Sequence, residues 1–242
     1  MEIDFEPSAY DDGFARDSLP PGALWPRLDL EASSGRYPAC VNAAVEILDR
    51  SIGRGFGANP CLRAPGVIWT YAELIDKSNR IAEVLSRDLG LKSGGRVLLR
   101  GFNSPMLAAC WFGVLKAGGI AVTTMPLLRA RELAEIVDKA RIEIALYEAS
   151  LGDELAVARA RAPVLRTICA FLGTAPDGLE ARMAAASGRF EAFAPSRDDV
   201  ALIAFTSGTS GKPKATLHMH RDVLAIVDCV GEHVTRFCPR MS

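Results

Sequence analysis

The 242-residue sequence lacks an excess of charge of either sign. It holds 28 lysine and arginine residues against 29 aspartate and glutamate residues, which gives a formal net charge of −1. A chain with this balance has no net field that would attract nucleic acid or an anionic membrane surface. The composition therefore argues against those two classes of partner and favours small molecules or another protein.

Closely spaced cysteine pairs are also lacking. The six cysteines never form the CxxC pairs that zinc and redox sites tend to use. The N-terminus, MEIDFEPSAYDD, has neither the basic nor the apolar region of a signal peptide, so nothing in it directs export. In a cytoplasmic protein we expect reduced core thiols rather than disulfides or metal ligands at Cys40, Cys61, Cys110, Cys169, Cys229 and Cys238.

A long apolar run is missing as well. The one candidate for a membrane span, Met106 to Met125, is interrupted by Lys116 and by the Gly118-Gly119 pair. A spanning helix needs about 20 consecutive apolar residues. The pattern instead predicts a buried helix followed by a buried strand, with no role for a membrane.

The first part of the chain, residues 1–39, is rich in proline and has scattered glycine and acidic residues. Such a composition predicts an extended arm that lies on the body of the protein. Its expected apolar anchors are Leu24, Trp25 and Leu28. The remaining residues, 40–242, contain no internal repeat and are expected to form one α/β unit.

Short apolar runs alternate with helical patterns of ten or more residues along this unit. Thr70 with Glu73 forms a capping box at the start of one helix, and Ser104-Pro105 is typical of the start of another. This alternation predicts a mostly parallel sheet covered by helices on both faces. Expected strands are 67–69, 96–100, 120–123, 142–147, 166–171 and 200–205; expected helices are 42–50, 70–90, 104–117, 129–140, 151–161, 178–186 and 221–235.

The strand at 200–205 leads directly into a loop of hydroxyl, glycine and lysine residues, Thr206 to Lys214. Glycine lets backbone N–H groups turn toward an anion, hydroxyl groups donate further hydrogen bonds, and lysine adds positive charge. The order of these residues after a strand favours a phosphate cradle over a flexible surface loop of the same composition.

Two known phosphate loops do not fit this segment. A Walker A loop needs glycine where Thr206 stands and Ser or Thr where Pro213 stands. A Rossmann fingerprint needs a third glycine after Gly208 and Gly211, which is absent.

The segment FTSGTSGKPKATLHMHRDVLA instead resembles the signature of the adenylate-forming (AMP-binding) superfamily, TSGT[TS]GxPKG, which includes the acyl-CoA synthetases. Ala215 departs from the usual glycine. That departure, together with LPPGALWP and RVLLRGFNSPMLAACWFGVLKAGGIAVTTMPLLRARELAEI, is similar to the benzoate and 2-aminobenzoate CoA ligase branch. The resemblance runs from about residue 18 to the end and implies the N-terminal subdomain of an adenylate-forming enzyme.

The resemblance implies a reaction with three substrates. A carboxylic acid, here an aromatic one, would be joined to ATP with Mg²⁺ to give an acyl-adenylate, which coenzyme A then attacks. By this analogy the β- and γ-phosphates are bound by Thr206, Ser207, Gly208, Thr209, Ser210 and Gly211, while Lys214 neutralises the leaving pyrophosphate. Lys212 occupies the variable position of the motif, so we expect it at the solvated surface.

Other candidate residues have simpler explanations. His218 and His220 form an HxH pair without a nearby third ligand, which favours packing at the strand-to-helix turn over a metal site. Trp111 and Phe112 are expected in the core rather than in an acid pocket. The charged run from Arg129 to Glu135 is expected to be a solvated helix face.

The later motifs of the superfamily, which supply the adenine pocket, the acid pocket and a catalytic lysine, are not found in these 242 residues. No catalytic residue can therefore be assigned, and we expect this chain alone not to complete a catalytic cycle. A P-loop-like NTPase and a non-catalytic nucleotide-binding or interaction fragment remain as alternatives. The oligomeric state stays open, with a homodimer as one option.

Overall fold

The centre of the protein is a six-stranded sheet in the order β6-β5-β3-β4-β7-β8. The computed structural model describes residues 5–25, 37–207 and 213–230. Five strands run parallel and only β8, at one edge, is antiparallel to its neighbour. This confirms the predicted α/β class with a mostly parallel sheet. The strands are β3 (Arg96–Arg100), β4 (Ile120–Thr124), β5 (Ile144–Glu148), β6 (Thr167–Phe171), β7 (Val200–Ser207) and β8 (Pro213–Met219).

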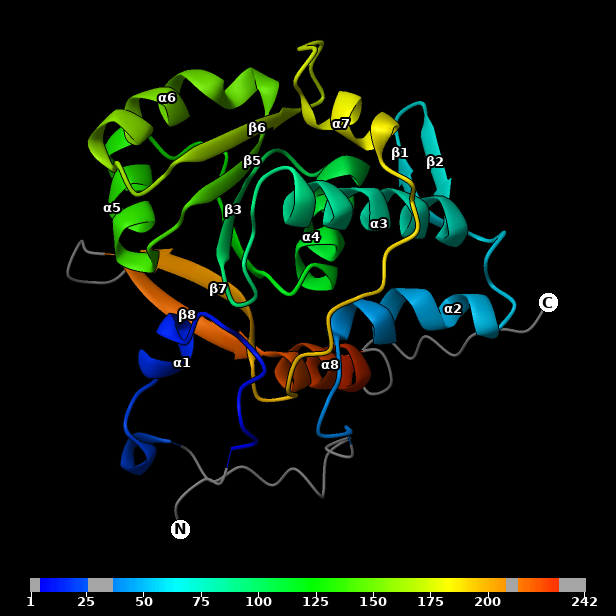
Figure 1. The fold of residues 1–242 in the computed structure, drawn as a ribbon, viewed down its shortest axis with the longest axis horizontal. Helices are drawn as coiled ribbons and strands as arrows, with labels where there is room; N and C mark the ends of the chain where they lie inside the picture. Colours follow the sequence, from blue (N-terminus) through cyan, green and yellow to red (C-terminus); the bar gives the residue numbers. More distant parts are fainter. Residues whose placement is uncertain (1–4, 26–36, 208–212, 231–242) are drawn as a thin grey trace.

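Helices cover both faces of this sheet (Figure 1). Side chains alternate along each strand, so Val97 and Leu99 of β3 pack in one core cluster and Leu98 packs in the other. The first cluster lies under α3 (Tyr71–Arg87), α4 (Pro105–Lys116) and α7 (Leu179–Ala185), and the second under α5 (Ala130–Ala140) and α6 (Gly152–Arg161). The predicted membrane-span candidate is α4 followed by β4. Within the described part of the chain, no helix is long and apolar enough to cross a membrane.

Local capping signals set where the main helices begin. At α3 the hydroxyl of Thr70 accepts a hydrogen bond from the Glu73 N–H at 3.2 Å, and the Glu73 carboxylate accepts one from the Thr70 N–H at 2.8 Å. At α4 the Ser104 hydroxyl accepts from the Leu107 N–H at 3.2 Å. These bonds satisfy backbone donors that the first turn of a helix leaves unpaired. Both predicted helix starts are thereby confirmed.

The structure adds elements that the sequence did not predict. β2 (Val67–Thr70) pairs in an antiparallel hairpin with an unexpected strand, β1 (Pro60–Ala64). The predicted helix at 42–50 is a π-helical segment, η2 (Val45–Asp49), which continues into α2 (Arg50–Gly53). The short helical turn η3 (Ala149–Leu151) was not predicted either, whereas the predicted helix at 221–235 corresponds to α8 (His220–Cys229) within the described residues.

The N-terminal segment lies along the base of β7 and β8 and contains α1 (Phe14–Asp17) and a short turn, η1 (Gly22–Leu24). The prediction that Leu24 anchors this segment is wrong, because its side chain is 74% exposed. Trp25 packs edge-on against Phe5, with ring centroids 5.1 Å apart. Leu28 lies outside the described residues. The buried contact is made instead by Ala15.

The cysteines only partly match the expectation of core thiols. Cys110 and Cys169 are buried, and burial raises the pKa of both thiols. Cys61 is half-buried, whereas Cys40 and Cys229 are exposed, which corrects the prediction for those two. All five are free thiols, and Cys238 lies outside the described residues.

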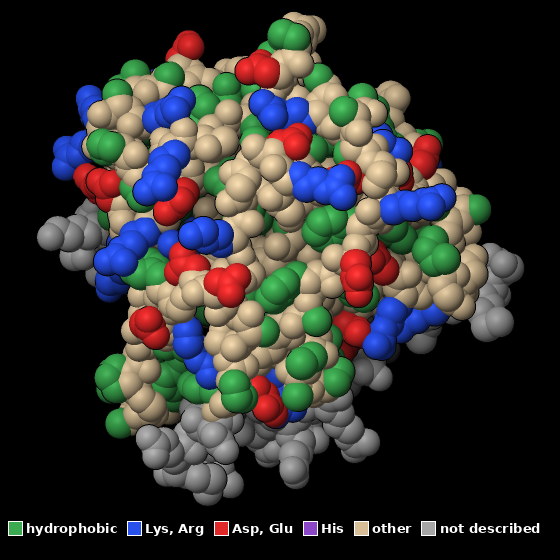
Figure 2. Space-filling model, in the orientation of Figure 1, with side chains coloured by type: hydrophobic (Ala, Val, Ile, Leu, Met, Phe, Trp, Pro, Cys, Tyr) green, Lys and Arg blue, Asp and Glu red, His purple; other side chains and the backbone are tan. Residues whose placement is uncertain are grey.

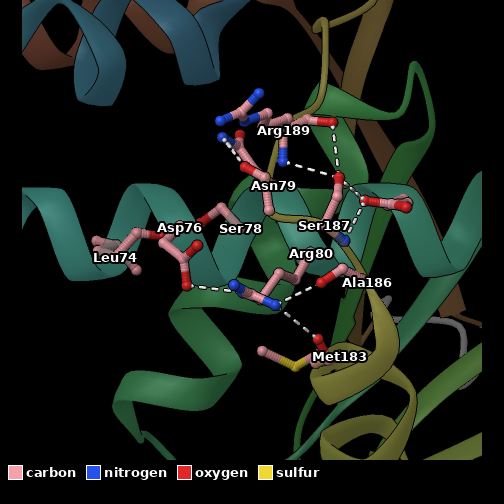
Figure 3. A network of polar contacts seen from close by, with 11 residues as sticks. Leu74, Asp76, Ser78, Asn79, Arg80, Met183, Ala186, Ser187 and Arg189 are labelled. Atoms are coloured by element: carbon pink, nitrogen blue, oxygen red, sulfur yellow. Dashed lines mark hydrogen bonds and ion pairs between the residues drawn. The ribbon is translucent and has the colours of Figure 1, made fainter.

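The polar segment 188–199 connects α7 to β7 without a helix or strand of its own, and contacts from α3 hold its start. Asn79 donates a hydrogen bond to the Gly188 carbonyl at 3.1 Å, and Arg80 donates to the Met183 carbonyl at 3.1 Å (Figure 3). The Ser187 hydroxyl donates to the Glu83 carboxylate at 2.8 Å. These contacts fix the path by which the chain reaches β7.

Candidate functional site

The predicted phosphate loop lies at the tip of the β7–β8 hairpin. In the register of the two strands Thr206 faces Lys214 and Ser207 faces Pro213. Thr206 and Ser207 therefore end β7, and Lys214 belongs to β8 rather than to the loop, which corrects the prediction of a loop running to Lys214. The residues between the strand ends, Gly208, Thr209, Ser210, Gly211 and Lys212, lie outside the described residues.

The hairpin register places Thr206 and Lys214 on the same face. Residues directly opposite each other in an antiparallel pair point to the same side of the sheet. Their neighbours Phe205 and Ala215 pack on the α5 side, so Thr206 and Lys214 project from the other side, where both are exposed. The register thus brings the Thr206 and Lys214 side chains to the same exposed face where the two strands end.

The strand β7 ends at the carboxyl edge of the sheet. β7 is parallel to β4, and through β4 to β3, β5 and β6, so all five strands end at this edge. In open α/β sheets ligands bind outside the carboxyl ends of the strands. The end of β7, where the predicted phosphate loop begins, therefore lies at the edge where such ligands bind.

The β8 strand is also fastened to the body. The Lys139 ammonium at the end of α5 donates a hydrogen bond to the Pro213 carbonyl at 2.7 Å. The side chain of Thr216 donates to the Ala204 carbonyl of β7 at 3.1 Å. Both contacts hold the strand that presents Lys214.

Two buried carboxylates at the base of the hairpin were not predicted from the sequence. Asp198 and Asp199 directly precede β7, and both are at most 1% exposed. Asp198 forms a buried ion pair with Arg221 of α8. Asp199 accepts hydrogen bonds from the Ser8 hydroxyl at 2.5 Å and from the Ala9 N–H at 3.0 Å. The N-terminal segment is therefore bonded to the base of the hairpin.

The fully buried His220 completes this base. Its Nδ1 accepts a hydrogen bond from the Ala43 N–H at 3.1 Å, which leaves the proton on Nε2. That Nε2 donates to the Tyr10 hydroxyl at 3.0 Å, and this hydroxyl donates to the Val200 carbonyl at 3.1 Å. Desolvation lowers the pKa of His220 to about 3 and, with the nearby Asp199 charge, raises the pKa of Tyr10.

The contacts of His220 agree with the predicted packing role. His218 lies half-buried on β8, in register with Leu202. In the part of the chain that the structure describes, no group of three or more His, Cys, Asp or Glu side chains could hold a metal ion.

The charged and aromatic residues to which the sequence analysis assigned no ligand-binding role pack in the core or lie at the surface. Trp111 and Phe112 pack against the first core cluster and against each other, with ring centroids 5.1 Å apart. Arg131 pairs with Glu135 one helical turn away at 3.2 Å on the exposed face of α5. Basic and acidic side chains are interspersed over the visible face, as the near-zero net charge suggests (Figure 2).

The chain belongs to the family of AMP-binding enzymes, whose model matches residues 50–239. It is 28% identical over 190 residues to the benzoate–CoA ligase of Thauera aromatica, a match that covers 78% of this chain and 36% of the relative. It is 27% identical over 235 residues to a long-chain-fatty-acid–CoA ligase of Escherichia coli O6:H1, covering 81% of this chain and 41% of the relative.

The fold agrees with that of a solved family structure. The anthranilate CoA ligase AuaEII, solved in complex with anthranoyl-AMP, superposes with a TM-score of 0.76 at 23% identity, covering 85% of this chain and 38% of the other. At this identity the match shows the fold alone. The chain spans less than half the length of the relatives it matches.

Proposed function

We propose that the protein provides the phosphate-binding part of an AMP-forming acid–CoA ligase. The observation that carries this proposal is the β7–β8 hairpin, which presents Thr206 and Lys214 together at the carboxyl edge of the sheet in a member of the AMP-binding family. Residues 1–39 would serve as the arm, and residues 40–242 as the N-terminal α/β part of the nucleotide-binding domain.

In this proposal the hairpin tip binds the β- and γ-phosphates of ATP. Adenylate formation places negative charge on the transferring phosphate and on the departing pyrophosphate, so donors aimed at these oxygens stabilise the transition state more than the ground state. Thr206, Ser207, Thr209 and Ser210 would donate from their hydroxyl groups, and Gly208 and Gly211 from the backbone. Lys214 would neutralise the leaving group, and Mg²⁺ would arrive bound to ATP.

We further propose an aromatic acid as the substrate and coenzyme A as the acceptor. Residues 96–136, together with Ala215 in the hairpin, resemble the benzoate and 2-aminobenzoate CoA ligase branch. The relatives that match include ligases named for benzoate and for long-chain fatty acids, so this finer assignment rests on those segments.

The test compares two lysines of the hairpin in the 242-residue chain. We expect Lys214→Ala to weaken binding of Mg²⁺-ATP by about 10-fold or more, because a hydrogen bond to a charged group contributes about 1.5–3 kcal/mol. Lys212→Ala, at the variable position of the motif, is the matched control and should leave the dissociation constant unchanged. Isothermal titration calorimetry measures both.

The alternatives give different results in the same titration. Loss of binding with Lys212→Ala but not with Lys214→Ala would favour a P-loop-like NTPase. No ATP binding by the unaltered chain would favour a non-catalytic interaction fragment.

A further inference from the structure

Four cationic side chains are buried in the described part of the chain, and they are not alike. Arg96, Lys116 and Arg221 each have a carboxylate partner within ion-pair distance: Asp12 at 2.6 Å, Asp49 at 2.6 Å and Asp198, respectively. Arg100 is 1% exposed and forms no ion pair with any described carboxylate. A buried guanidinium without a counter-ion carries a desolvation cost that its paired counterparts offset.

Hydrogen bonds to Arg100 do not compensate for the missing carboxylate. Its guanidinium contacts three main-chain carbonyls, those of Leu151 at 3.5 Å, Met125 at 3.4 Å and Leu128 at 3.1 Å. Good N–H···O bonds measure about 2.9–3.0 Å, so two of these contacts are long. With five N–H donors, the group retains capacity to bind an oxyanion in a bidentate manner.

The place of Arg100 in the fold favours a ligand over a purely structural role. It is the last residue of β3, between Thr124 of β4 and Tyr147 of β5, at the same carboxyl edge as the hairpin tip. The pKa of Arg100 is lowered, because the effect of burial exceeds the opposite effect of the nearby Glu154 charge. One strand, β4, lies between β3 and β7 and therefore separates Arg100 from the end of β7.

A cavity of about 540 Å³ adjoins Arg100, between the loops that follow β4 and β5. A volume of this size suits a small organic molecule. Leucine and proline side chains form part of the wall, and Leu127 is 75% exposed. Arg129, Asp153 and Glu154 also line the cavity. Arg129 pairs with Glu154 at 2.9 Å, so the negative charge of Asp153 is left beside Arg100 and disfavours a polyanion such as a phosphate.

We propose that Arg100 and this cavity form a binding site for a small monocarboxylate with an apolar body. The guanidinium would bind the carboxylate in place of its long contacts to Met125 and Leu151, and the leucine side chains would contact the apolar part. This site is separate from the phosphate loop, and ligand binding there does not require ATP.

The first experiment measures binding to the 242-residue chain by isothermal titration calorimetry without nucleotide. Benzoate, acetate and inorganic phosphate are the probes. We expect benzoate to bind more tightly than acetate, phosphate not to bind, and Arg100→Met to weaken benzoate binding at least 10-fold. Arg131→Met, which removes an exposed arginine of α5 outside the cavity, is the matched control and should change nothing.

Three results would overturn the proposal: no benzoate binding, benzoate binding that Arg100→Met leaves intact, or Arg100-dependent binding of phosphate in preference to benzoate. Failure of ATP binding would contradict the proposed function instead, and it would leave this titration unaffected.

A second measurement tests whether Arg100 serves to bind a ligand or to stabilise the fold. Arg221→Met leaves Asp198 buried without its partner, so we expect a clear drop in the melting temperature, Tm. Arg100→Met leaves no carboxylate unpaired, so its Tm should stay within about 2 °C of the unaltered chain. An equal drop in both variants would show that Arg100 holds the fold together, and would contradict the proposal.

Discussion

His220 shows how a titratable side chain is kept neutral inside this protein. Both ring nitrogens are hydrogen-bonded, to the Ala43 N–H and the Tyr10 hydroxyl, in an arrangement that only the neutral ring satisfies. Protonation of Nδ1 would turn it into a donor facing another donor. Burial of the ring adds the cost of removing a charge from water and lowers its pKa to about 3.

This pKa predicts a pH-dependent stability. In the unfolded chain the histidine pKa is about 6.5, so between pH 6.5 and about 3 the unfolded state binds a proton that the folded state does not. Stability from this residue is complete above pH 6.5 and is lost as pH falls toward 3. The full loss is on the order of 5 kcal/mol. Urea denaturation at a series of pH values measures it.

The matched variants are His220→Gln and His218→Gln. His220→Gln removes the proton uptake, so its free energy of unfolding should change less between pH 7 and 4 than that of the unaltered chain. His218 lies half-buried on β8 outside this network, and His218→Gln should retain the original slope. Equal slopes for all three proteins would show that His220 does not control the acid response.

Residues of the site differ in how far the sequence alone could locate them. Thr206 and Lys214 are predicted because a local motif follows a strand, and the structure places them opposite each other in the β7–β8 register. Asp198 and Asp199 were missed because the sequence of this polar loop does not indicate that residues of the N-terminal segment donate hydrogen bonds to its carboxylates. Their partners are set by tertiary contact, which has no local signal.

At the scale of elements, helices were predicted more completely than strands. The helices α3 and α4 carry their own start signals at Thr70 and Ser104. β1 and β8 carry none, and each is defined only by its pairing with another strand. The Pro-Lys pair of the motif favoured a loop over a strand at the start of β8. In the structure, however, the chain from Pro213 to Met219 pairs along the length of β7.

Gly188 provides a prediction about the segment that α3 holds. Its φ of +75° lies in the left-handed region, which costs a residue with a side chain about 1–2 kcal/mol. A Cβ here would also overlap the Asp76 carboxylate, which bonds to Arg80 at 2.8 Å (Figure 3). We expect Gly188→Ala to lower the free energy of unfolding by more than the backbone cost alone, as measured by urea denaturation.

Gly66 of the β1–β2 turn is the matched control for this change. It has a nearly equal φ of +73°, and no atom lies within 4 Å of the position of an added Cβ. Gly66→Ala should therefore show the backbone cost of about 1–2 kcal/mol by itself. If the two variants were equally destabilised, the Asp76 carboxylate would move aside from the new Cβ at no cost, and the prediction of an added steric penalty would be wrong.

At the scale of the whole molecule, the N-terminal segment is bonded to residues that flank both strands at the base of the β7–β8 hairpin. Asp199 precedes β7 and His220 follows β8, and the segment bonds to both through Ser8 and Tyr10. The base of the hairpin is thus enclosed within the fold, while the described end of β7 lies at the carboxyl edge of the sheet. In the proposed function, this enclosed base would give the phosphate loop a rigid support.

The same view separates nucleotide binding from catalysis. The chain matches the family over residues 50–239 but spans only 36% to 41% of the relatives described above. We expect the purified 242-residue chain to bind Mg²⁺-ATP through the hairpin and to form neither acyl-adenylate nor acyl-CoA from benzoate, ATP and coenzyme A. Binding needs only the phosphate donors, whereas turnover also requires an oriented acid and a catalytic group.

Pyrophosphate release and mass spectrometry of the reaction mixture measure the two products. The benzoate–CoA ligase of Thauera aromatica, assayed in parallel, verifies the assay. Because ATP binding is measured separately on the same preparation, a chain that binds ATP without turnover agrees with the expectation. Benzoyl-AMP or benzoyl-CoA above the level of a no-protein control would contradict it, and would mean that these 242 residues hold a catalytic group that neither the motif nor the fold assigns.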